Sequence, residues 1–270
     1  MAIITISRGT ASGGEMLAKG LAEKLGYRIV TLETLVKNAS RMGPREDTLQ
    51  DAIFKPPGLL ERLGHKRRSY LAFIQLALCE EVKEGNVIYE GNAGHLLLPP
   101  ETNILRVRMI APLALRIRML REKRDISYDD AVAYVHKVDE QRRMWTKFLY
   151  GVDILDPQLY DMILNLHTME ISSAVEMVSV AARRPEFVPD EKQRRCLNDY
   201  LLAGRVAAAL ATDPRTSELD VDVTAEEGAL SLSGRLATEA QVEAVLEIAK
   251  GVDGVKSIDR DGLDHSEPLI

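Results

Sequence analysis

The sequence has little cysteine and no long hydrophobic run. Its two cysteines, Cys79 and Cys196, have neither the partners of a zinc site nor the number of a disulfide scaffold. Cys79 lies in an apolar helical run, so we predict a buried and unreactive thiol. No segment reaches the roughly 18 apolar residues that a membrane-spanning helix needs, and the first residues lack the basic start of a signal peptide. We therefore expect a cytoplasmic protein and predict no metal-ligating residues.

A strong excess of charge is also missing, although the charge is unevenly distributed. The net charge is −6, and hydrophobic and charged residues make up 46% and 28% of the sequence, as in ordinary globular proteins. Residues 199–270 contain 6 basic and 15 acidic residues, a net of −9, whereas the other 198 residues contain 29 and 26, a net of +3. Pro185 and Pro189 discourage a continuous helix near this junction. We predict a first domain over residues 1–185, a linker over 186–197 and a second domain over 198–265.

The chain begins with part of a phosphate-binding motif. Residues 3–6 form a β-branched run, a loop of small residues follows, and Leu17, Leu21 and Leu25 have helical spacing. Glycines in such a loop let backbone N–H groups approach a phosphate, and the helix N-terminus adds its positive dipole end. This order of elements is typical of the motif G-x-x-x-x-G-K-[ST].

The motif lacks its lysine and its hydroxyl. Arg8 stands in place of the first glycine, Gly13 keeps the second, Gly14 replaces the lysine and Glu15 replaces the hydroxyl residue. The missing lysine would contact the β- and γ-phosphates, and the Glu15 carboxylate would repel them unless a metal or an arginine intervenes. Taken alone, the loop is consistent with a nucleotide site and with a plain tight turn from strand to helix.

Predicted strands alternate with predicted helices along the first two thirds of the chain. The strands cover residues 3–6, 27–30, 86–90, 103–110 and 160–166. The helices between them include residues 69–82, a segment that starts at Pro112, and residues 127–148. This alternation predicts an α/β fold with a parallel, doubly wound, five-stranded sheet and right-handed crossovers. The small-residue loop then follows the first strand, which favours the nucleotide site over the plain turn.

Three pairs of side chains have the spacing of helix caps. They are Ser127 with Asp130, Ser173 with Glu176, and Thr238 with Gln241. A hydroxyl three residues before an acidic or amide side chain can satisfy the free N–H groups of a first helical turn. Each pair therefore predicts the start of a helix.

Two regions between these elements allow more than one interpretation. Residues 31–68 have weak periodicity, three prolines and several basic residues, which suits either a solvated helical excursion or a mobile lobe that faces an anion. Cations also cluster from Arg116 to Lys147, more densely than solubility requires, although exposed helix faces do carry such runs. Within that cluster Asp139 and Arg142 are three residues apart, so a simple surface pair is an alternative to a functional role.

Several segments together resemble the cytidylate kinase-like family, a branch of the nucleoside monophosphate kinases. They begin with Ile-Thr-Ile-Ser-Arg, the Ser-Gly-Gly loop and Leu-Ala-Glu-Lys-Leu-Gly, and continue with Val-Ile-Tyr-Glu-Gly and Arg-Met-Ile-Ala-Pro-Leu-Ala-Leu-Arg-Ile-Arg. The Asp-x-x-Arg helix at Asp139 and Arg142 and the pair Tyr160 and Asp161 complete the similarity. It covers about residues 1–182.

The resemblance implies a P-loop kinase core with sheet order 2-3-1-4-5, a mobile monophosphate-binding lobe and an arginine-bearing lid. It also implies ATP and Mg²⁺ as cofactors. The residues that it places around the donor phosphates are Arg8, Ser12, Gly13, Gly14, Glu15 and Met16. Those that it places in the catalytic lid are Asp139, Arg142 and Arg143, and those on the acceptor side are Glu90, Gly91, Asn92 and Arg116. The chain departs from true cytidylate kinases in the missing lysine and in Gly91-Asn92-Ala93, where they have Gly-Arg-Asp.

The acidic tail resembles a BON domain, a small α/β interaction module. A helix from Asn198 to Asp213, strands over 219–224 and 228–234, a helix from Thr238 to Lys250 and a strand over 254–258 are predicted in that order. Leu-Ser-Gly and Gly-Val-Asp-Gly-Val-Lys carry the resemblance. The net charge of −9 opposes binding to anionic lipid, so a protein partner or self-association is favoured over a membrane.

These patterns predict an ATP-dependent phosphotransferase of the cytidylate kinase type, with a degenerate P-loop and a small-molecule nucleotide as substrate. We predict no nucleic-acid partner. The competing hypothesis is an inactive protein that senses a nucleotide or another anion, which the substitutions at Gly14 and Glu15 favour. A structural adaptor organised by the tail, with an empty turn in place of the P-loop, is a third hypothesis.

Overall fold

The structure, a computed structural model, describes residues 2–54 and 64–264, with the backbone alone at 52–54 and 64–69. The described residues form two compact units. The first holds residues 2–35, 53–54 and 84–190, and the second holds residues 36–52, 64–83 and 191–264. The partial phosphate-binding motif lies in the first unit, and the acidic tail lies in the second.

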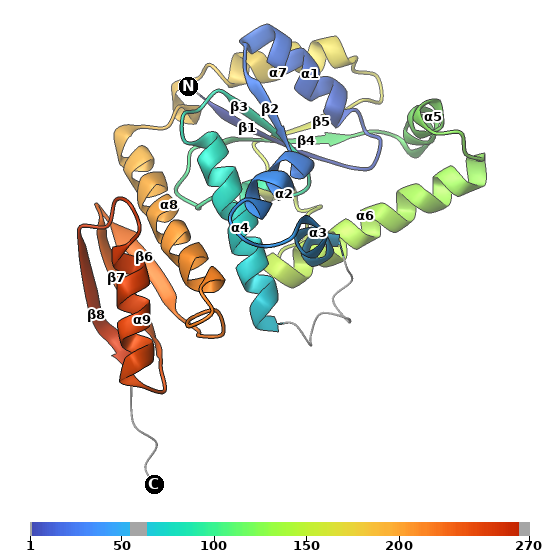
Figure 1. Cartoon of the computed structure of the whole chain (residues 1–270). Helices are drawn as coiled ribbons and strands as arrows, with labels where there is room; N and C mark the ends of the chain where they lie inside the picture. The colour runs from blue at the N-terminus through green and yellow to red at the C-terminus, as the bar shows by residue number, and fades with distance from the viewer. Residues whose placement is uncertain (1, 55–63, 265–270) are drawn as a thin grey trace. The chain divides into compact units, whose positions relative to one another are not determined.

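A parallel sheet of five strands forms the centre of the first unit (Figure 1). Its strands are β1 (Ile3–Arg8), β2 (Arg28–Thr31), β3 (Val87–Glu90), β4 (Leu105–Ile110) and β5 (Met162–Asn165). Their order across the sheet is β2-β3-β1-β4-β5, and every neighbouring pair is parallel. The predicted fold class and strand order are confirmed.

One face of this sheet is covered by α1 (Gly14–Leu25) and α7 (Ile171–Ala181), which lie side by side (Figure 1). The side chains buried between them and the strands include Ile4, Ile6, Leu17, Leu21, Ile88, Val107, Met109, Leu164, Val175 and Val178. Each fully buried aliphatic side chain contributes about 1.5–3 kcal/mol relative to an exposed one, so this core holds α1 and α7 on the sheet. Gly26 ends α1 with a φ of 71°, as its position in the sequence predicts.

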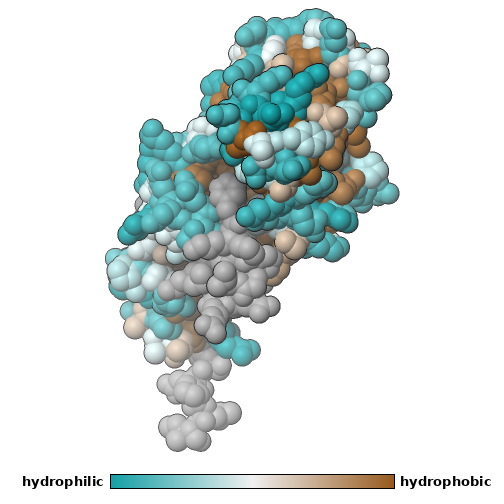
Figure 2. All heavy atoms as spheres, turned by 90° about the vertical axis from the view of Figure 1, so that its right-hand side faces the viewer, coloured by the Kyte–Doolittle hydropathy of each residue, from teal (hydrophilic) through white to brown (hydrophobic). Residues whose placement is uncertain are grey.

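Two helices follow β4, namely α5 (Leu113–Lys123) and α6 (Tyr128–Tyr150). The Ser127 hydroxyl accepts a hydrogen bond from the Asp130 N–H at 3.1 Å, so the predicted start of α6 is confirmed. Figure 2 views the molecule from the side of α5 and α6, and hydrophilic side chains cover much of that face. Many of the cations on these helices are exposed.

The predicted cap of Ser173 and Glu176 is wrong. Helix α7 starts at Ile171, its N-cap residue is Glu170, and no side chain caps it. The Ile171 side chain packs against the core, so packing sets the first turn before the Ser173 hydroxyl can act as a cap. Glu176 instead forms an ion pair with Lys24 of α1.

Residues 31–68 are mainly helical where the structure describes them. They form α2 (Leu32–Ser40), α3 (Glu46–Phe54) and the start of α4 (Gly64–Val82), and residues 55–63 lie outside the described part. Helix α4 starts before the predicted Ser69. Cys79 of α4 is fully buried, so the prediction of a buried thiol is confirmed, and burial raises the pKa of this thiol to about 12. Whether residues 31–68 face an anion stays a prediction.

The acidic tail forms a three-stranded sheet with two helices. The elements are α8 (Glu191–Thr212), β6 (Asp222–Glu226), β7 (Ala229–Arg235), α9 (Glu239–Lys250) and β8 (Ser257–Asp264). Strand β7 lies between β6, which is antiparallel to it, and β8, which is parallel. The Thr238 hydroxyl accepts a hydrogen bond from the Gln241 N–H at 3.3 Å, which confirms that predicted cap.

Helix α8 begins at Glu191 rather than at the predicted Asn198. Leu197 of its early part is buried, as are Leu202 and Val206 farther along, so one apolar stripe extends over both predicted linker and predicted domain. The domain limits proposed from the sequence stay a prediction.

Short 3₁₀ helices cover Gly94–Leu96, Pro157–Leu159 and Pro185–Phe187. Among the described residues no helix has the length and apolarity to cross a membrane.

Candidate functional site

The loop between β1 and α1 has the backbone shape of an anion-binding turn. Ala11 and Gly13 have φ values of 54° and 87°, in the left-handed region. Helix α1 begins directly after Gly13, so the N–H groups of Gly14, Glu15 and Met16 have no carbonyl one turn earlier in the helix. Free N–H groups at a helix N-terminus attract a phosphate.

Gly13 has no room for a side chain. A Cβ atom there would lie 2.6 Å from Leu166 Cδ1 and 3.2 Å from Ile171 Cδ1. The positive φ adds strain for any residue other than glycine. This position therefore requires glycine for both conformation and space.

Ser12 closes the loop from inside. Its buried hydroxyl contacts the carbonyl oxygens of Gly9 and Met109, both at 2.9 Å. Because both contacts are carbonyls, the hydroxyl donates to the backbone and ties the loop to β4. The structure therefore places this predicted phosphate ligand in a loop-holding position.

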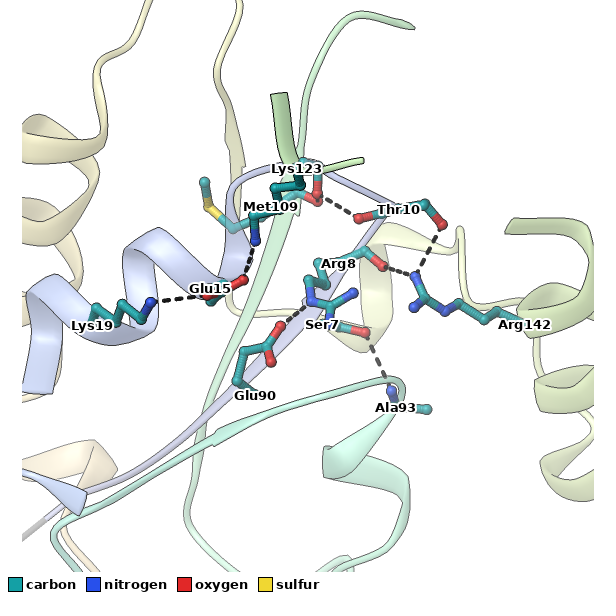
Figure 3. Close-up of polar contacts among 12 residues, drawn as sticks. Ser7, Arg8, Thr10, Glu15, Lys19, Glu90, Ala93, Met109, Lys123 and Arg142 are labelled. Atoms are coloured by element: carbon teal, nitrogen blue, oxygen red, sulfur yellow. Dashed lines mark hydrogen bonds and ion pairs between the residues drawn. The ribbon is translucent and has the colours of Figure 1, made fainter. Parts of the chain in front are cut away.

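Two lysines neutralise the carboxylate that replaces the motif's hydroxyl. Glu15 forms ion pairs with Lys19, at 2.9 Å, and with Lys123 of α5 (Figure 3). Hydrogen bonds from Lys123 and Lys19 lower the pKa of Glu15 to about 2. The repulsion that a bare carboxylate would exert on a phosphate is therefore reduced by two lysines, and not by a metal or an arginine. Met16, the next residue, is 48% exposed.

Asp139 of α6 holds the loop at Thr10. Its carboxylate accepts hydrogen bonds from the Thr10 N–H at 2.9 Å and from the Thr10 hydroxyl at 2.8 Å, and it forms an ion pair with Arg116 of α5. Arg116 also donates to the Thr10 carbonyl at 2.7 Å. Burial by itself would raise the pKa of Asp139, but the bonds from Thr10 and Arg116 outweigh it and hold the pKa below its ordinary value. Asp139 and Arg116 thus position the loop.

Arg142 lies one helical turn beyond Asp139 and reaches the same loop. Its Nη1 donates to the Thr10 hydroxyl at 3.3 Å and to the Arg8 carbonyl at 3.5 Å (Figure 3). Burial and the nearby charge of Arg8 lower the pKa of Arg142 to about 10, so it is still protonated at neutral pH. The alternative of a simple surface pair with Asp139 does not describe these contacts. Arg143 points elsewhere and forms an exposed ion pair with Asp153 at 2.7 Å.

One ion pair, between Glu90 and Arg8, joins the predicted acceptor side to the strand that leads into the loop. Glu90, buried at the end of β3, pairs with Arg8 at the end of β1 (Figure 3). The Gly91 N–H donates to the Ile6 carbonyl at 3.2 Å, so this residue acts through its backbone. The Asn92 side-chain oxygen is buried without a hydrogen-bond partner among the described residues. The structure thus brings Arg8, Glu90 and Arg142 to one loop.

Two known families match parts of this chain. The sequence model of the cytidylate kinase-like family matches residues 3–168, from β1 to beyond β5. The chain belongs to the cytidylate kinase-like family. The BON domain model matches residues 198–264, which contain most of α8 and the three-stranded sheet.

Relatives of this cytidylate kinase-like chain are similar over the same region. Cytidylate kinase from Ignicoccus hospitalis is 27% identical over 181 residues, which make up 66% of this chain and 97% of that protein. Cytidylate kinase from Pyrococcus horikoshii is 25% identical over 195 residues, 72% of this chain and 94% of that protein. An uncharacterized protein from Eubacterium ventriosum has a similar fold, with a TM-score of 0.54 and 18% identity over 67% of this chain and 97% of that chain. The first unit therefore has a nucleotide kinase-like fold.

A buried polar cluster, which the sequence patterns did not predict, lies beside the loop of this kinase-like unit. Arg108 of β4 is buried and donates to the Tyr160 hydroxyl at 3.1 Å, and that hydroxyl contacts Ser7 at 3.5 Å. His95 lies edge-on to the Tyr160 ring, with a centroid distance of 5.1 Å. A signal was present in the sequence, because an arginine in the middle of a buried strand is rare.

Stability in mild acid is expected to depend on His95. Both of its ring nitrogens are buried without partners among the described residues, and burial, with Arg106 and Arg108 nearby, lowers its pKa to about 4. The unfolded chain binds this proton near the ordinary pKa of about 6.5, so stability is complete above that pH and falls as the pH drops toward 4. His95→Phe keeps an aromatic ring at this position and removes the group that binds the proton. We expect wild type to lose about 2 kcal/mol relative to this variant between pH 7 and pH 5, measured by urea denaturation; parallel pH profiles would contradict the assignment.

Asp139→Asn is expected to loosen the loop. The amide oxygen can take the place of Oδ1 and accept both hydrogen bonds from Thr10, but the amide NH2 replaces Oδ2, so the ion pair with Arg116 is lost. We expect the free energy of unfolding to fall by about 1–3 kcal/mol, as for a partly buried charged hydrogen bond. Asp153→Asn, which breaks the exposed pair with Arg143, is the control and should lower the free energy of unfolding less than Asp139→Asn does. Equal costs in urea denaturation would show that Asp139 is an ordinary surface residue.

Proposed function

We propose that the protein is an ATP-dependent phosphotransferase of the nucleoside monophosphate kinase type, with a nucleotide as acceptor. The observation that carries this proposal is the contact of Arg142 with the loop, at Thr10 and at Arg8. A plain strand-to-helix turn has no need of a partly buried cation from a distant helix. A site for a phosphate chain does need one, because several negative charges meet there.

The chemistry that such a site performs is mostly positioning and charge neutralisation. The free N–H groups at the start of α1 would bind the donor phosphates, and Arg142 would neutralise charge on the transferred group. Asp139 and Arg116 would hold the loop in place without touching substrate. The family resemblance assigns Asp139, Arg142 and Arg143 to the lid, and the contacts support different roles for them, since Arg143 pairs with Asp153.

Mg²⁺ has no ready set of ligands in the described part of the chain. No cluster of three or more histidine, cysteine, aspartate or glutamate side chains could hold a metal there. Glu15 replaces the hydroxyl that holds Mg²⁺ in P-loop enzymes, and its carboxylate is engaged by two lysines. We therefore assign no step to Mg²⁺.

A nucleotide or anion sensor without turnover is the second candidate. The specific observation in its favour is the absence of a lysine at Gly14, which removes the usual contact to the β- and γ-phosphates. Binding of a nucleotide without transfer would leave the loop and Arg142 in the same arrangement. Binding and transfer must therefore be measured separately.

For the acidic tail we propose a protein partner or self-association, and two domains that meet between residues 185 and 198. The match to a BON domain supports an interaction role, and the net charge of −9 over residues 199–270 disfavours anionic lipid. Light scattering of the full chain, compared with a chain that ends before α8, would test self-association.

A thermal-shift panel of ATP, ADP, CMP, UMP and AMP, each with and without Mg²⁺, tests nucleotide binding by the full chain. A ligand at 100 times its Kd stabilises the folded state by about 2.7 kcal/mol, which raises the melting temperature by several degrees. We expect ATP and one monophosphate to do so. No shift with any nucleotide would contradict both the kinase and the nucleotide sensor and would favour the structural adaptor.

A further inference from the structure

The side chain of Arg8 lies where the side chain of the motif's lysine would begin. Gly14 occupies the lysine position, and a Cβ atom built on it would lie 2.5 Å from Arg8 Cδ, 3.1 Å from Arg8 Cβ and 3.2 Å from Arg8 Cγ. The aliphatic part of Arg8 therefore runs along the backbone of Gly14. A lysine at position 14 and Arg8 in its present conformation exclude one another.

The guanidinium of Arg8 uses one of its N–H groups for an ion pair within the described part of the chain. Its Nε pairs with the Glu90 carboxylate, which is buried, and no hydrogen bond of its two terminal amino groups is found among the described residues. A guanidinium has five N–H donors, so four remain for a ligand. Glu90 fixes the direction of Arg8 while leaving the forked end that suits phosphate oxygens.

A second guanidinium, that of Arg142, reaches the backbone of Arg8. Arg142 contacts the Arg8 carbonyl at 3.5 Å, and the charge of Arg8 adds to the effect of burial in lowering the pKa of Arg142. Two cations that repel each other at the mouth of a phosphate-type loop are stabilised when an anion binds between them. Lys19 and Lys123 do not fill this role, because both are paired with Glu15.

We propose that Arg8 supplies the cation that contacts the β- and γ-phosphates, in place of the lysine that the motif lacks, and that position 14 is glycine to make room for it. This inference rests on the proposed function. In the transfer, an acceptor phosphate oxygen bonds to the γ-phosphorus as the bond to the β–γ bridging oxygen breaks with its electron pair. ATP and a monophosphate thereby become ADP and a diphosphate. Arg8 stays protonated throughout and neutralises charge on the migrating group, and Glu90 is a positioning residue.

The test moves the cation from one position to the other. Arg8→Ala combined with Glu90→Gln removes the pair without leaving a buried carboxylate uncompensated, and Gly14→Lys is then added to that background. The control is Lys24→Ala with Glu176→Gln, which removes an ion pair elsewhere in the same unit. ATP affinity is measured by calorimetry without an acceptor, and transfer is measured as a single-turnover rate with an acceptor.

We expect loss of Arg8 to weaken ATP binding at least about tenfold and to slow transfer about 10²–10³-fold, as for removal of one preorganised donor. Lysine at position 14 should recover at least tenfold of the lost rate, and the control should match wild type. Affinity and rate within twofold of wild type in a folded protein without Arg8 would overturn the proposal. So would a folded lysine variant that recovers neither quantity, because the two cations would then not share one place.

The outcome also separates this inference from the proposed function. Wild type that transfers phosphate at a rate independent of Arg8 keeps the function and rejects the inference. Wild type that makes no product rejects the function, and the ATP affinity of the Arg8 variants then decides the binding role by itself.

Discussion

Replacing Arg142 by alanine is expected to lower kcat by about 10³–10⁵-fold, the range that a phosphate-facing arginine supplies in phosphoryl transfer. ATP affinity should change far less. Charge on the transferred group is redistributed in the transition state, and a cation that acts mainly there stabilises it more than the bound substrate. The contacts of Arg142 with Thr10 and Arg8 place its charge at the loop, and it is protonated at neutral pH.

The measurement is a comparison of kcat and ATP affinity between wild type, Arg142→Ala and Arg121→Ala. Arg121 is an exposed arginine of α5 that donates to the Ile126 carbonyl at 3.2 Å, so its variant should keep wild-type values. A fall in kcat no larger than the fall in ATP affinity would indicate ground-state binding, as in a sensor. Unchanged values in both would assign Arg142 to structure alone.

Gly13→Val is expected to abolish nucleotide binding. The valine side chain would clash with Leu166 and Ile171 and would have to adopt a φ of 87°, so the loop must change shape. The same strain should lower the free energy of unfolding by about 1–3 kcal/mol, which a stable core tolerates. Binding is measured by calorimetry with ATP, and folding is checked by circular dichroism.

A matched control exists at the other end of the same helix. Gly26 also has a positive φ, 71°, but a Cβ there would meet nothing within 4 Å. Gly26→Val carries a similar backbone strain away from the loop, so it should lose stability and keep nucleotide binding. Unchanged ATP affinity in a folded Gly13→Val protein would reject the loop as the nucleotide site.

The fold could be predicted from the sequence because its pattern is local. The buried runs that became β1, β3 and β4 are bounded by clear breaks, and Gly26 and Ser127 mark helix ends through backbone and hydroxyl chemistry that does not depend on distant residues. The Ser173 cap failed for the opposite reason. The start of α7 depends on how Ile171 packs against strands that are far away in the sequence.

The candidate site was only partly predictable, because its contacts join residues that are far apart in the chain. Arg8 pairs with a glutamate 82 residues away, and Thr10 binds an aspartate 129 residues away. Composition could show that cations and carboxylates were present near α5 and α6, but it could not pair them. The spacing of Asp139 and Arg142 therefore suggested a surface pair as readily as the loop contacts that the structure has.

Single-turnover transfer of the γ-phosphate from ATP to CMP, dCMP, UMP and AMP by the full chain tests the central claim most directly. The account predicts a nucleoside diphosphate with at least one of these acceptors, and loss of that product in Gly13→Val. ATP binding without product from any acceptor would contradict it and would make the protein a nucleotide sensor.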